Sequence, residues 1–355
     1  MEKSSVFNIS ENVKSIFDNS RQNNIDLLRC IAVAAVFIHH AQHTFGGNFP
    51  FLGSYGGQFG PQLFFLISGY LITVSCQKHS LRDYFFHRSF RILPAYLFFF
   101  LTIGFVSGGI NISKILQFPG YFFANLVLWQ QLFPSALLTF DVLHVTWTLT
   151  VEVLWYALAP LILWLLKGSV RWPAVLFFAV FSSLWSYFAS QRKFDFLFPG
   201  VTDSNPGFSY LFLGNHFFSQ ICFFILGSWI YSHREKLKTW NPITGFVLGS
   251  MIFMLMPYYM VFNPIFITGV GLTYFMIAAI NSTSIKNRLV FFISETSYSI
   301  YLCHFPIILW VRHSLGLDSF AGVGLSLLLT ILIAFLSFIF IEKPGMKVGR
   351  FLTKK

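Results

Sequence analysis

Residues 25–45, IDLLRCIAVAAVFIHHAQHTF, are long and apolar enough to cross a bilayer as one helix, since a span needs roughly 20 residues at a rise of about 1.5 Å each. The stretch nevertheless carries Asp26, Arg29, His39 and His40. At about 100° per residue, Arg29 and His40 lie about 20° apart on one helix face and about 16 Å apart along its axis. Asp26 joins this face within about 60°, whereas His39 points about 80° away from Arg29.

This polar face is unusual because ionisable side chains are costly in hydrocarbon and normally face a cavity or a pathway. We therefore predict that Arg29 and His40 line a functional site. The simpler alternative is a solvated helix start followed by one interfacial histidine.

The composition extends the membrane interpretation to the whole chain. Of its 355 residues, 55% are hydrophobic, 20% aromatic and only 10% charged, compared with about 25% charged residues in a typical soluble domain. Hydrophobic runs continue to the C-terminus, and a polar segment of 24 residues precedes the first run. We therefore expect the first run to be a mature membrane span rather than a cleaved signal peptide.

The hydrophobic runs predict an all-α, polytopic membrane helix bundle of about ten transmembrane helices. Their approximate bounds are 25–45, 58–76, 92–110, 144–166, 172–190, 211–231, 242–260, 264–281, 289–311 and 320–341. We expect residues 1–24 to be a cytoplasmic N-terminal tail, residues 25–344 the transmembrane domain, and residues 345–355 a cytoplasmic basic tail. Residues 46–57 and 111–143 are expected to be external, with residues 121–133 forming an interfacial or re-entrant segment.

The formal net charge of +11 is explained by topology. Lys and Arg gather in both termini and in alternate connections, and the intervening connections hold only Lys114, Arg192, Lys193 and Arg312. This positive-inside pattern places both termini in the cytoplasm and argues against a nucleic-acid partner. The four cysteines all fall within predicted spans, without the spacing of a disulfide or a metal site, and are interpreted as small buried hydrophobic residues.

The densest cytoplasmic basic segment is KHSLRDYFFHRSFR, residues 78–91. Within it, Arg88 and Arg91 share a helix face at the membrane boundary because they are three residues apart. They could form an ordinary anchor that reaches lipid phosphates. They could instead clamp a phosphorylated ligand, because arginine binds phosphate oxygens in a bidentate way.

Further polar residues lie within the spans. Ser68 fits a structural role better than a catalytic one, because its hydroxyl can bond its own backbone. Glu152 lies about 12 Å below the predicted outer surface and must be neutral, paired or exposed to a cavity. It could also make only a structural hydrogen bond to a neighbouring helix.

The predicted topology sorts these residues into two layers. The layer toward the cytoplasm contains Asp26, Arg29, Arg88, Arg91 and Glu342. The layer toward the outside contains His40, Glu152 and His304. The inner layer suits an anionic, phosphate-bearing ligand, and the outer layer suits proton transfer. The distance between them is comparable with the pantetheine arm of coenzyme A, so a nucleotide held inside could extend its thioester toward His40.

Six short motifs occur in one order along the chain: IDLLRCIAVAAVFIHH (25–40), FFLISGYLIT (64–73), HRSFRILPAY (87–96), HVTWTLTVEVLWY (144–156), SYSIYLCHFPI (297–307) and IEKP (341–344). In this order they resemble the membrane acyltransferase-3 family of bacterial O-acyltransferases, from Asp26 to Pro344. Arg29 and His40 match that family's Arg-X10-His signature, and residues 88–91 match its RxxR motif. The chain departs from the family pattern in helix four, where Thr148 and Thr150 replace the usual serines and Val153 replaces a common second acid.

The resemblance implies an enzyme of the bacterial cytoplasmic (inner) membrane. It would transfer an acyl group, usually acetyl, from cytoplasmic acyl-CoA to a hydroxyl of a cell-surface or lipid-linked carbohydrate. The co-substrate would be acetyl-CoA and no metal is expected; the partners would be the lipid bilayer and a glycan acceptor, and the oligomeric state is left open.

The resemblance also implies roles for individual residues. His40 would be the general base that takes the hydroxyl proton, and Glu152 would orient it or hold the sugar. His39 is an adjacent second candidate for the base, and an acyl-histidine intermediate is an alternative route. Arg29, Arg88 and Arg91 would hold the CoA phosphates. Substrate binding or structural support is expected from Asp26, His39, Ser68, Trp147, Tyr298, His304 and Glu342.

A proton-coupled secondary transporter or flippase is the alternative function, with His40, Glu152 and His304 as a proton relay. Two features weigh against it: paired interrupted spans are not evident in two halves of the chain, and the arginines gather at the cytoplasmic face rather than at the midplane. A receptor or scaffold would leave Glu152 unexplained.

Overall fold

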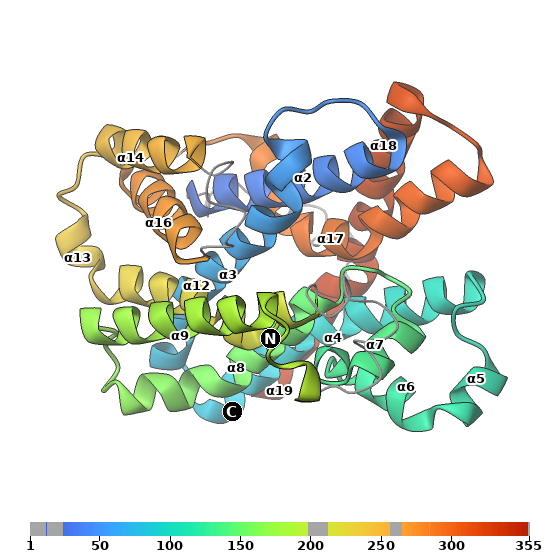
Figure 1. The fold of residues 1–355 in the computed structure, drawn as a ribbon, viewed down its shortest axis with the longest axis horizontal. Coiled ribbons are helices and arrows are strands. Elements are labelled where there is room, and N and C mark those ends of the chain that lie inside the picture. The colour runs from blue at the N-terminus through green and yellow to red at the C-terminus, as the bar shows by residue number, and fades with distance from the viewer. Residues whose placement is uncertain (1–11, 13–23, 198–211, 256–264, 284, 354–355) are drawn as a thin grey trace, which may run out of the picture.

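The computed structural model describes residues 12, 24–197, 212–255, 265–283 and 285–353 (Figure 1). Within these residues every regular element is helical, which confirms the all-α prediction. Six of the described helices are long and apolar enough to cross a membrane: α2 (Asn24–Phe45), α3 (Leu52–Lys78), α4 (Leu81–Val106), α8 (Trp147–Leu165), α9 (Trp172–Ser190) and the run Ser319–Thr353. These helices indicate a multi-pass membrane protein.

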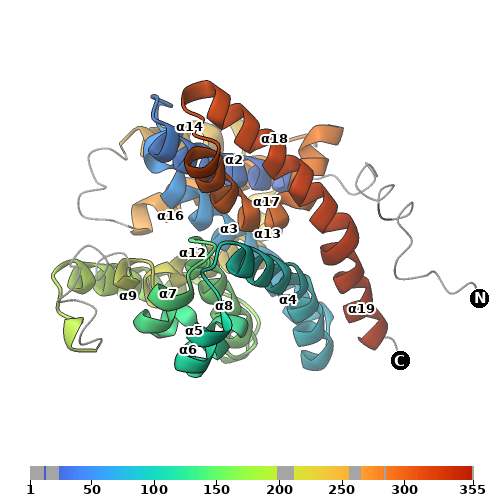
Figure 2. The ribbon, with the colours of Figure 1, turned by 90° about the vertical axis from the view of Figure 1, so that its right-hand side faces the viewer.

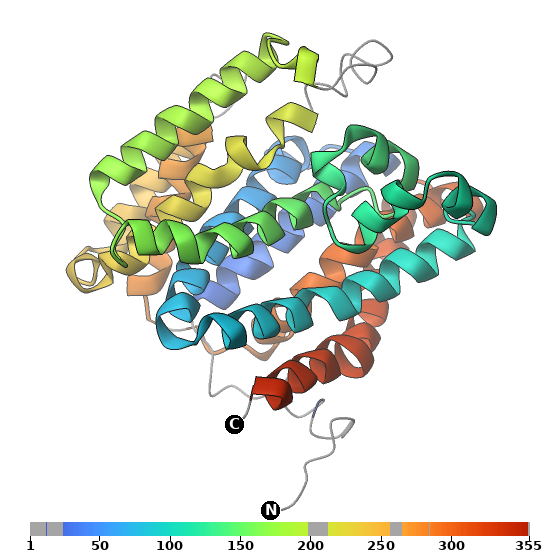
Figure 3. The same cartoon turned by 90° about the horizontal axis from the view of Figure 1, so that it is seen from below.

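Four more helices complete the bundle: α12 (Phe217–Ser232), α14 (Pro242–Met254), α16 (Ile265–Asn281) and α17 (Arg288–Ser314). Each of the ten predicted ranges overlaps a helix of the described part. The number of membrane crossings and the cytoplasmic position of both termini stay predictions. α2 packs against α3 and α17, and α3 packs against α12, so the polar first span lies within the bundle. Figure 3 shows α9, α8 and α4 (yellow-green, green and cyan) on the face of the bundle nearest the viewer.

Helix α3 begins at Leu52, six residues before the predicted span, so the expected external loop 46–57 is partly helical. Glycines allow this early start. A Cβ atom at Gly56 would collide with the backbone carbonyl of Ala35, and one at Gly60 would collide with Val36 of α2. Small residues let two membrane helices approach closely, and this close packing continues the helix into the predicted loop.

Helix α4 begins at Leu81 rather than near Ile92, so the basic segment belongs to the helix itself. The side chain of Ser80 accepts a hydrogen bond from the backbone N–H of Asp83 at 3.2 Å and caps the first turn. Arg88 and Arg91 therefore lie two to three turns inside α4. This start gives them a rigid helical support instead of a flexible flank.

Short helices fill the connection from α4 to α8: α5 (Ile112–Gln117), α6 (Pro119–Leu126), η2 (Gln130–Leu132) and α7 (Pro134–Phe140). Buried Asn125 ties this segment together, because its Nδ2 donates to the carbonyls of Tyr121 at 2.9 Å and Ala136 at 3.0 Å. The hydroxyl of Tyr96 in α4 donates to the carbonyl of Asn125 at 2.8 Å. The connection is therefore fastened to the bundle, and the predicted interfacial segment 121–133 folds as α6 and η2.

The C-terminal run consists of α18 (Ser319–Ser337), a π-helical turn η5 (Phe338–Glu342) and α19 (Lys343–Thr353). Figure 2 shows α18 continuing into α19, which lies beside α4. A π-helical turn adds a residue to the helical turn and changes the direction of the following side chains. The predicted basic tail 345–355 is thus helical as far as Thr353.

We expect Gly345→Leu to destabilise the contact between α19 and α4. A Cβ atom at Gly345 would lie 2.7 Å from Cγ of Pro94 in α4, and overpacking of this kind costs about 1–3 kcal/mol. Thermal unfolding in detergent should therefore begin at a lower temperature than in the wild type. Gly324→Leu is the matched control, because nothing lies within 4 Å of a Cβ atom there; equal Tm values for the two variants would contradict this packing.

Candidate functional site

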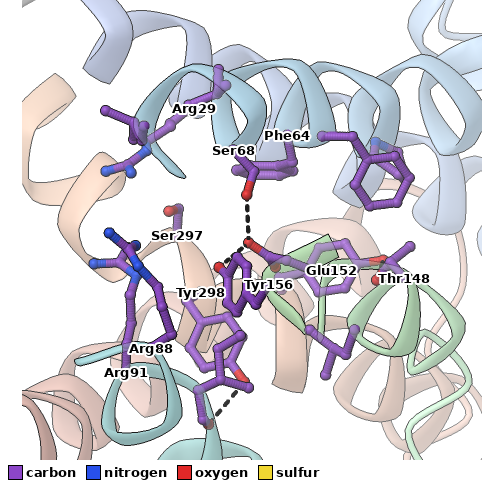
Figure 4. Close-up of a pocket in the computed structure, with 17 residues that line it drawn as sticks. Arg29, Phe64, Ser68, Arg88, Arg91, Thr148, Glu152, Tyr156, Ser297 and Tyr298 are labelled. Atoms are coloured by element: carbon purple, nitrogen blue, oxygen red, sulfur yellow. Dashed lines mark hydrogen bonds between the residues drawn. The ribbon is translucent and has the colours of Figure 1, made fainter. Parts of the chain in front are cut away.

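A polar cavity of about 90 Å³ lies among α2, α3, α4, α8 and α17 (Figure 4). This volume admits several water molecules, since one water needs roughly 10–15 Å³ on this measure. The cavity brings together six residues that the sequence analysis singled out: Arg29, Ser68, Arg88, Arg91, Glu152 and Tyr298.

Three guanidinium groups project into this cavity, Arg29 from α2 and Arg88 and Arg91 from α4 (Figure 4). Among the residues that the structure describes, no carboxylate oxygen lies within 4.0 Å of any of the three. The Nε atom of Arg88 is buried and has no hydrogen-bond partner, and its guanidinium lies 5.8 Å from the ring centre of Tyr156. Buried cations are stable only when an anion or hydrogen-bond acceptors compensate them, so the cavity has the character of a site for an anion.

Glu152 forms the other side of the cavity and is held by two hydroxyl groups. Ser68 Oγ donates to its Oε1 at 3.2 Å, and the hydroxyl of Tyr156 donates to the same oxygen. Tyr156 lies on the same face of α8 because it follows Glu152 by four residues. No site role was predicted for Tyr156 from the sequence, although its four-residue spacing from Glu152 could have identified it.

The two neighbouring histidines of α2 face different helices. His40 stacks on Phe305 of α17, with ring centres 4.1 Å apart, and its ring lies 5.3 Å from that of His304. His39 Nδ1 lies 2.7 Å from the carbonyl oxygen of Gly53 in α3. A carbonyl only accepts hydrogen bonds, so His39 donates through Nδ1 and is engaged with α3.

His304 is buried with one ring nitrogen left unpartnered. Its Nδ1 lies 2.8 Å from the carbonyl oxygen of Tyr301 and must donate to it. Its Nε2 is buried and has no hydrogen-bond partner. Tyr301 lines the polar cavity, and its ring centre lies 5.7 Å from that of His304. Tyr301, His304 and His40 therefore form a continuous row of rings that leads from the cavity to His40.

This arrangement corrects two geometric expectations. Glu152 lies with the arginines instead of the imidazoles, and within the described part of the chain no hydrogen bond joins it to His40. Arg29 lines the polar cavity, whereas His40 does not. Helical periodicity could not show that the α17 rings of Tyr301 and His304 lead from the cavity to His40.

The other predicted support residues are held by contacts of their own, and Tyr298 also lines the polar cavity. Asp26 accepts a hydrogen bond from Ser294 Oγ at 2.7 Å, and the hydroxyl of Tyr298 donates to the carbonyl of Ile92 at 3.0 Å. Glu342, at the end of η5, accepts a hydrogen bond from Ser299 Oγ at 2.9 Å. Trp147 packs its ring against Phe65. Among the described residues, no group of three His, Cys, Asp or Glu side chains could hold a metal ion.

Comparisons with known proteins support the resemblance found in the sequence. A family model described as "Acyltransferase domain" matches residues 22–342. The chain is 34% identical over 166 residues to Nodulation protein 10 of Rhizobium leguminosarum bv. viciae, covering 41% of this chain and 45% of that protein. It is 26% identical over 375 aligned positions to a "Putative O-acetyltransferase" of Staphylococcus aureus strain COL, covering 92% of this chain and 57% of the relative. The same values hold for the protein of strain MSSA476.

The chain thus spans about half the length of the curated relatives it matches. No solved structure matches it significantly.

Proposed function

Because this chain belongs to the acyltransferase-3 family of membrane proteins, we propose that it is an O-acyltransferase acting at the bacterial cytoplasmic membrane. It moves an acyl group, expected to be acetyl, from cytoplasmic acyl-CoA to a hydroxyl of a cell-surface or lipid-linked carbohydrate. The relatives named as O-acetyltransferases support acetyl as the transferred group. The observation that carries the proposal is the convergence of three arginines in one cavity, where no carboxylate oxygen of the described residues lies within 4.0 Å of them.

The arginine cavity is suited to the phosphate groups of the donor. Arg29, Arg88 and Arg91 bring three positive charges to one space, and each guanidinium can bind phosphate oxygens in a bidentate way. A donor phosphate would add negative charge beside these three cations. The cavity of about 90 Å³ is too small for the whole donor, so we expect it to hold a phosphate group alone, with Phe64 and Tyr301 lining the same cavity.

The imidazoles supply the proton transfer. The acceptor oxygen attacks the thioester carbonyl carbon while His40 takes the hydroxyl proton; the carbon–sulfur bond then breaks, and the proton passes to the CoA thiolate. His304 Nε2 is buried and has no hydrogen-bond partner among the described residues. It can accept a hydrogen bond from one ring N–H of His40, which leaves the other ring nitrogen of His40 to act as the base. His304 would thus be a positioning residue, comparable with the third member of a catalytic triad.

Membranes that contain the protein, incubated with acetyl-CoA labelled in the acetyl group, test the proposed function. We expect label to appear on envelope carbohydrate, in a form released by mild alkali as an O-ester should be. Membranes without the protein are the control. Transport of an envelope precursor without any transfer of label would instead establish the transporter alternative.

A further inference from the structure

A second cavity, of about 1110 Å³, lies along α4, α17 and α18 and is here called the lateral groove. Its walls are mainly apolar side chains from these three helices, including Phe98, Ile103, Ile307, Trp310, Leu329 and Ile333. The volume exceeds the ~300–1,000 Å³ of ordinary small-molecule pockets. Figure 2 shows α4, α17 and α18 gathered on one side of the molecule.

The apolar walls of the lateral groove require a hydrocarbon occupant. Phe98 is 41% exposed and Trp310 is 50% exposed, and both belong to helices of the membrane bundle. A sugar in this space would leave its own hydroxyl groups without hydrogen-bond partners, which is costly in an apolar environment. An alkyl or prenyl chain makes no such demand and covers the apolar walls.

One end of the groove is polar, and it is built around His144. Asp141 and His144 line it, and Lys114, whose Nζ lies 5.0 Å from the ring centre of the neighbouring Phe140, lines the groove close by. His313 lines the groove as well. The Oδ1 of Asp141 accepts hydrogen bonds from the backbone N–H of His144 at 3.0 Å and from Thr146 Oγ1 at 3.2 Å. These bonds hold His144 at a φ of 58°, a left-handed conformation that is uncommon for non-glycine residues and is often found at functional sites.

This polar end adjoins the proposed catalytic base. The ring of His144 lies 5.8 Å from that of Phe305, and Phe305 also stacks on His40, whose ring centre is 4.1 Å away. The residue that follows Phe305, Pro306, lines the lateral groove. Phe305 thus contacts both His40 and His144, and His144 lines the groove.

We propose that the lateral groove binds the hydrocarbon chain of a lipid-linked saccharide and presents its sugar at His144, next to His40. This inference rests on the proposed function and narrows the acceptor to one carried by a membrane lipid. Lys114 supplies positive charge at the end where the lipid's phosphate would lie. In the predicted topology this end faces the outside, so acceptor and donor approach from opposite sides of the membrane.

Photolabelling of the full chain in vesicles of phosphatidylethanolamine and phosphatidylglycerol tests this proposal. The probe is a prenyl phosphate-linked sugar with a diazirine on its prenyl chain, and the labelled peptides are identified by mass spectrometry. In the wild type we expect label on residues of the lateral groove. The variant Thr102→Trp/Leu329→Trp, which fills the groove, should lower this labelling at least tenfold.

The variant Phe105→Trp/Leu328→Trp is the matched control. It changes neighbouring residues of the same two helices that are 51% and 63% exposed and do not line the groove, so labelling should stay at the wild-type level. Equal labelling in both variants, or displacement of the probe by excess phosphatidylglycerol, would overturn the assignment.

Acetyl transfer is measured in the same vesicles, together with binding of labelled acetyl-CoA. We expect the groove-filling variant to lose transfer to the lipid-linked sugar while it still binds acetyl-CoA. Normal transfer in the absence of groove labelling would refute the groove proposal alone. Groove labelling in a wild-type protein that transfers acetyl to no carbohydrate would instead refute the proposed function.

Discussion

His40→Ala is expected to lower acyl transfer by about 10²–10⁴-fold, the usual contribution of a general base. Binding of acyl-CoA should remain close to the wild-type level, because His40 packs against Phe305 and His304 and does not line the arginine cavity. The two quantities are measured separately, as the initial rate of transfer from labelled acetyl-CoA and as equilibrium binding of the unreactive CoA.

Two further variants sharpen this prediction. His39→Ala removes the contact with Gly53 and should change the rate by less than tenfold, because the structure turns that ring toward α3. The double variant His40→Ala/His304→Ala should be hardly slower than His40→Ala, since residues that act as one unit are strongly non-additive. Wild-type turnover by His40→Ala would remove His40 from the mechanism, and a large loss in His39→Ala would make His39 the base.

Arg88→Ala is expected to raise the acyl-CoA concentration needed for half-maximal rate by about 10–100-fold. Hydrogen bonds to charged groups contribute roughly 1.5–3 kcal/mol, and each 1.4 kcal/mol corresponds to about tenfold in affinity. The maximal rate should change much less, because Arg88 lies in the cavity and apart from the imidazoles. Initial rates over a range of acetyl-CoA concentrations give both parameters.

Arg82→Ala is the matched control for Arg88→Ala. Arg82 is an exposed residue on the same helix, outside the cavity, where its guanidinium lies 5.7 Å from the ring centre of Phe86. Its loss removes the same charge and should leave the acyl-CoA requirement unchanged. Arg88→Lys should fall between the wild type and Arg88→Ala, because lysine keeps the charge without the bidentate fork. An equal effect of Arg82→Ala and Arg88→Ala would indicate attraction by overall charge rather than a binding site.

The sequence analysis succeeded where the physics is local. Helical periodicity predicted that Arg29 and His40 share one face of α2 and that His39 points away from it. In the structure Arg29 lines the polar cavity, His40 contacts α17 and His39 contacts α3. The three-residue spacing of Arg88 and Arg91 predicted that both would point the same way, and both line the cavity. Hydropathy located the helices, but not their ends at Leu52 and Leu81, since capping and glycine packing add turns that hydropathy does not detect.

The site was predicted less completely because its partners are distant in sequence. Depth along α8 suggested that Glu152 would meet His40, yet rotation about the helix axis turns Glu152 toward Ser68, 84 residues earlier in the chain. Tyr301 and His304 were within a recognised motif, but only the packing of α17 against α2 shows that their rings lead from the arginine cavity to His40. His144 opened a recognised motif but was given no role, because its backbone N–H bond to Asp141 and its contact with Phe305 appear only in the folded chain.

The sequence by itself determined the helical membrane class, the polar face of α2 and the family, because hydropathy, helical spacing and motif order are properties of single segments. Only the tertiary structure decided that Glu152 lines the same cavity as the arginines. It also decided that the buried Nε2 of His304 has no hydrogen-bond partner in the described part of the chain while its ring lies next to that of His40, and that His144 lines the lateral groove. These features arise where helices far apart in the chain meet, and the rotation of each helix in the bundle is set by the packing of all its neighbours.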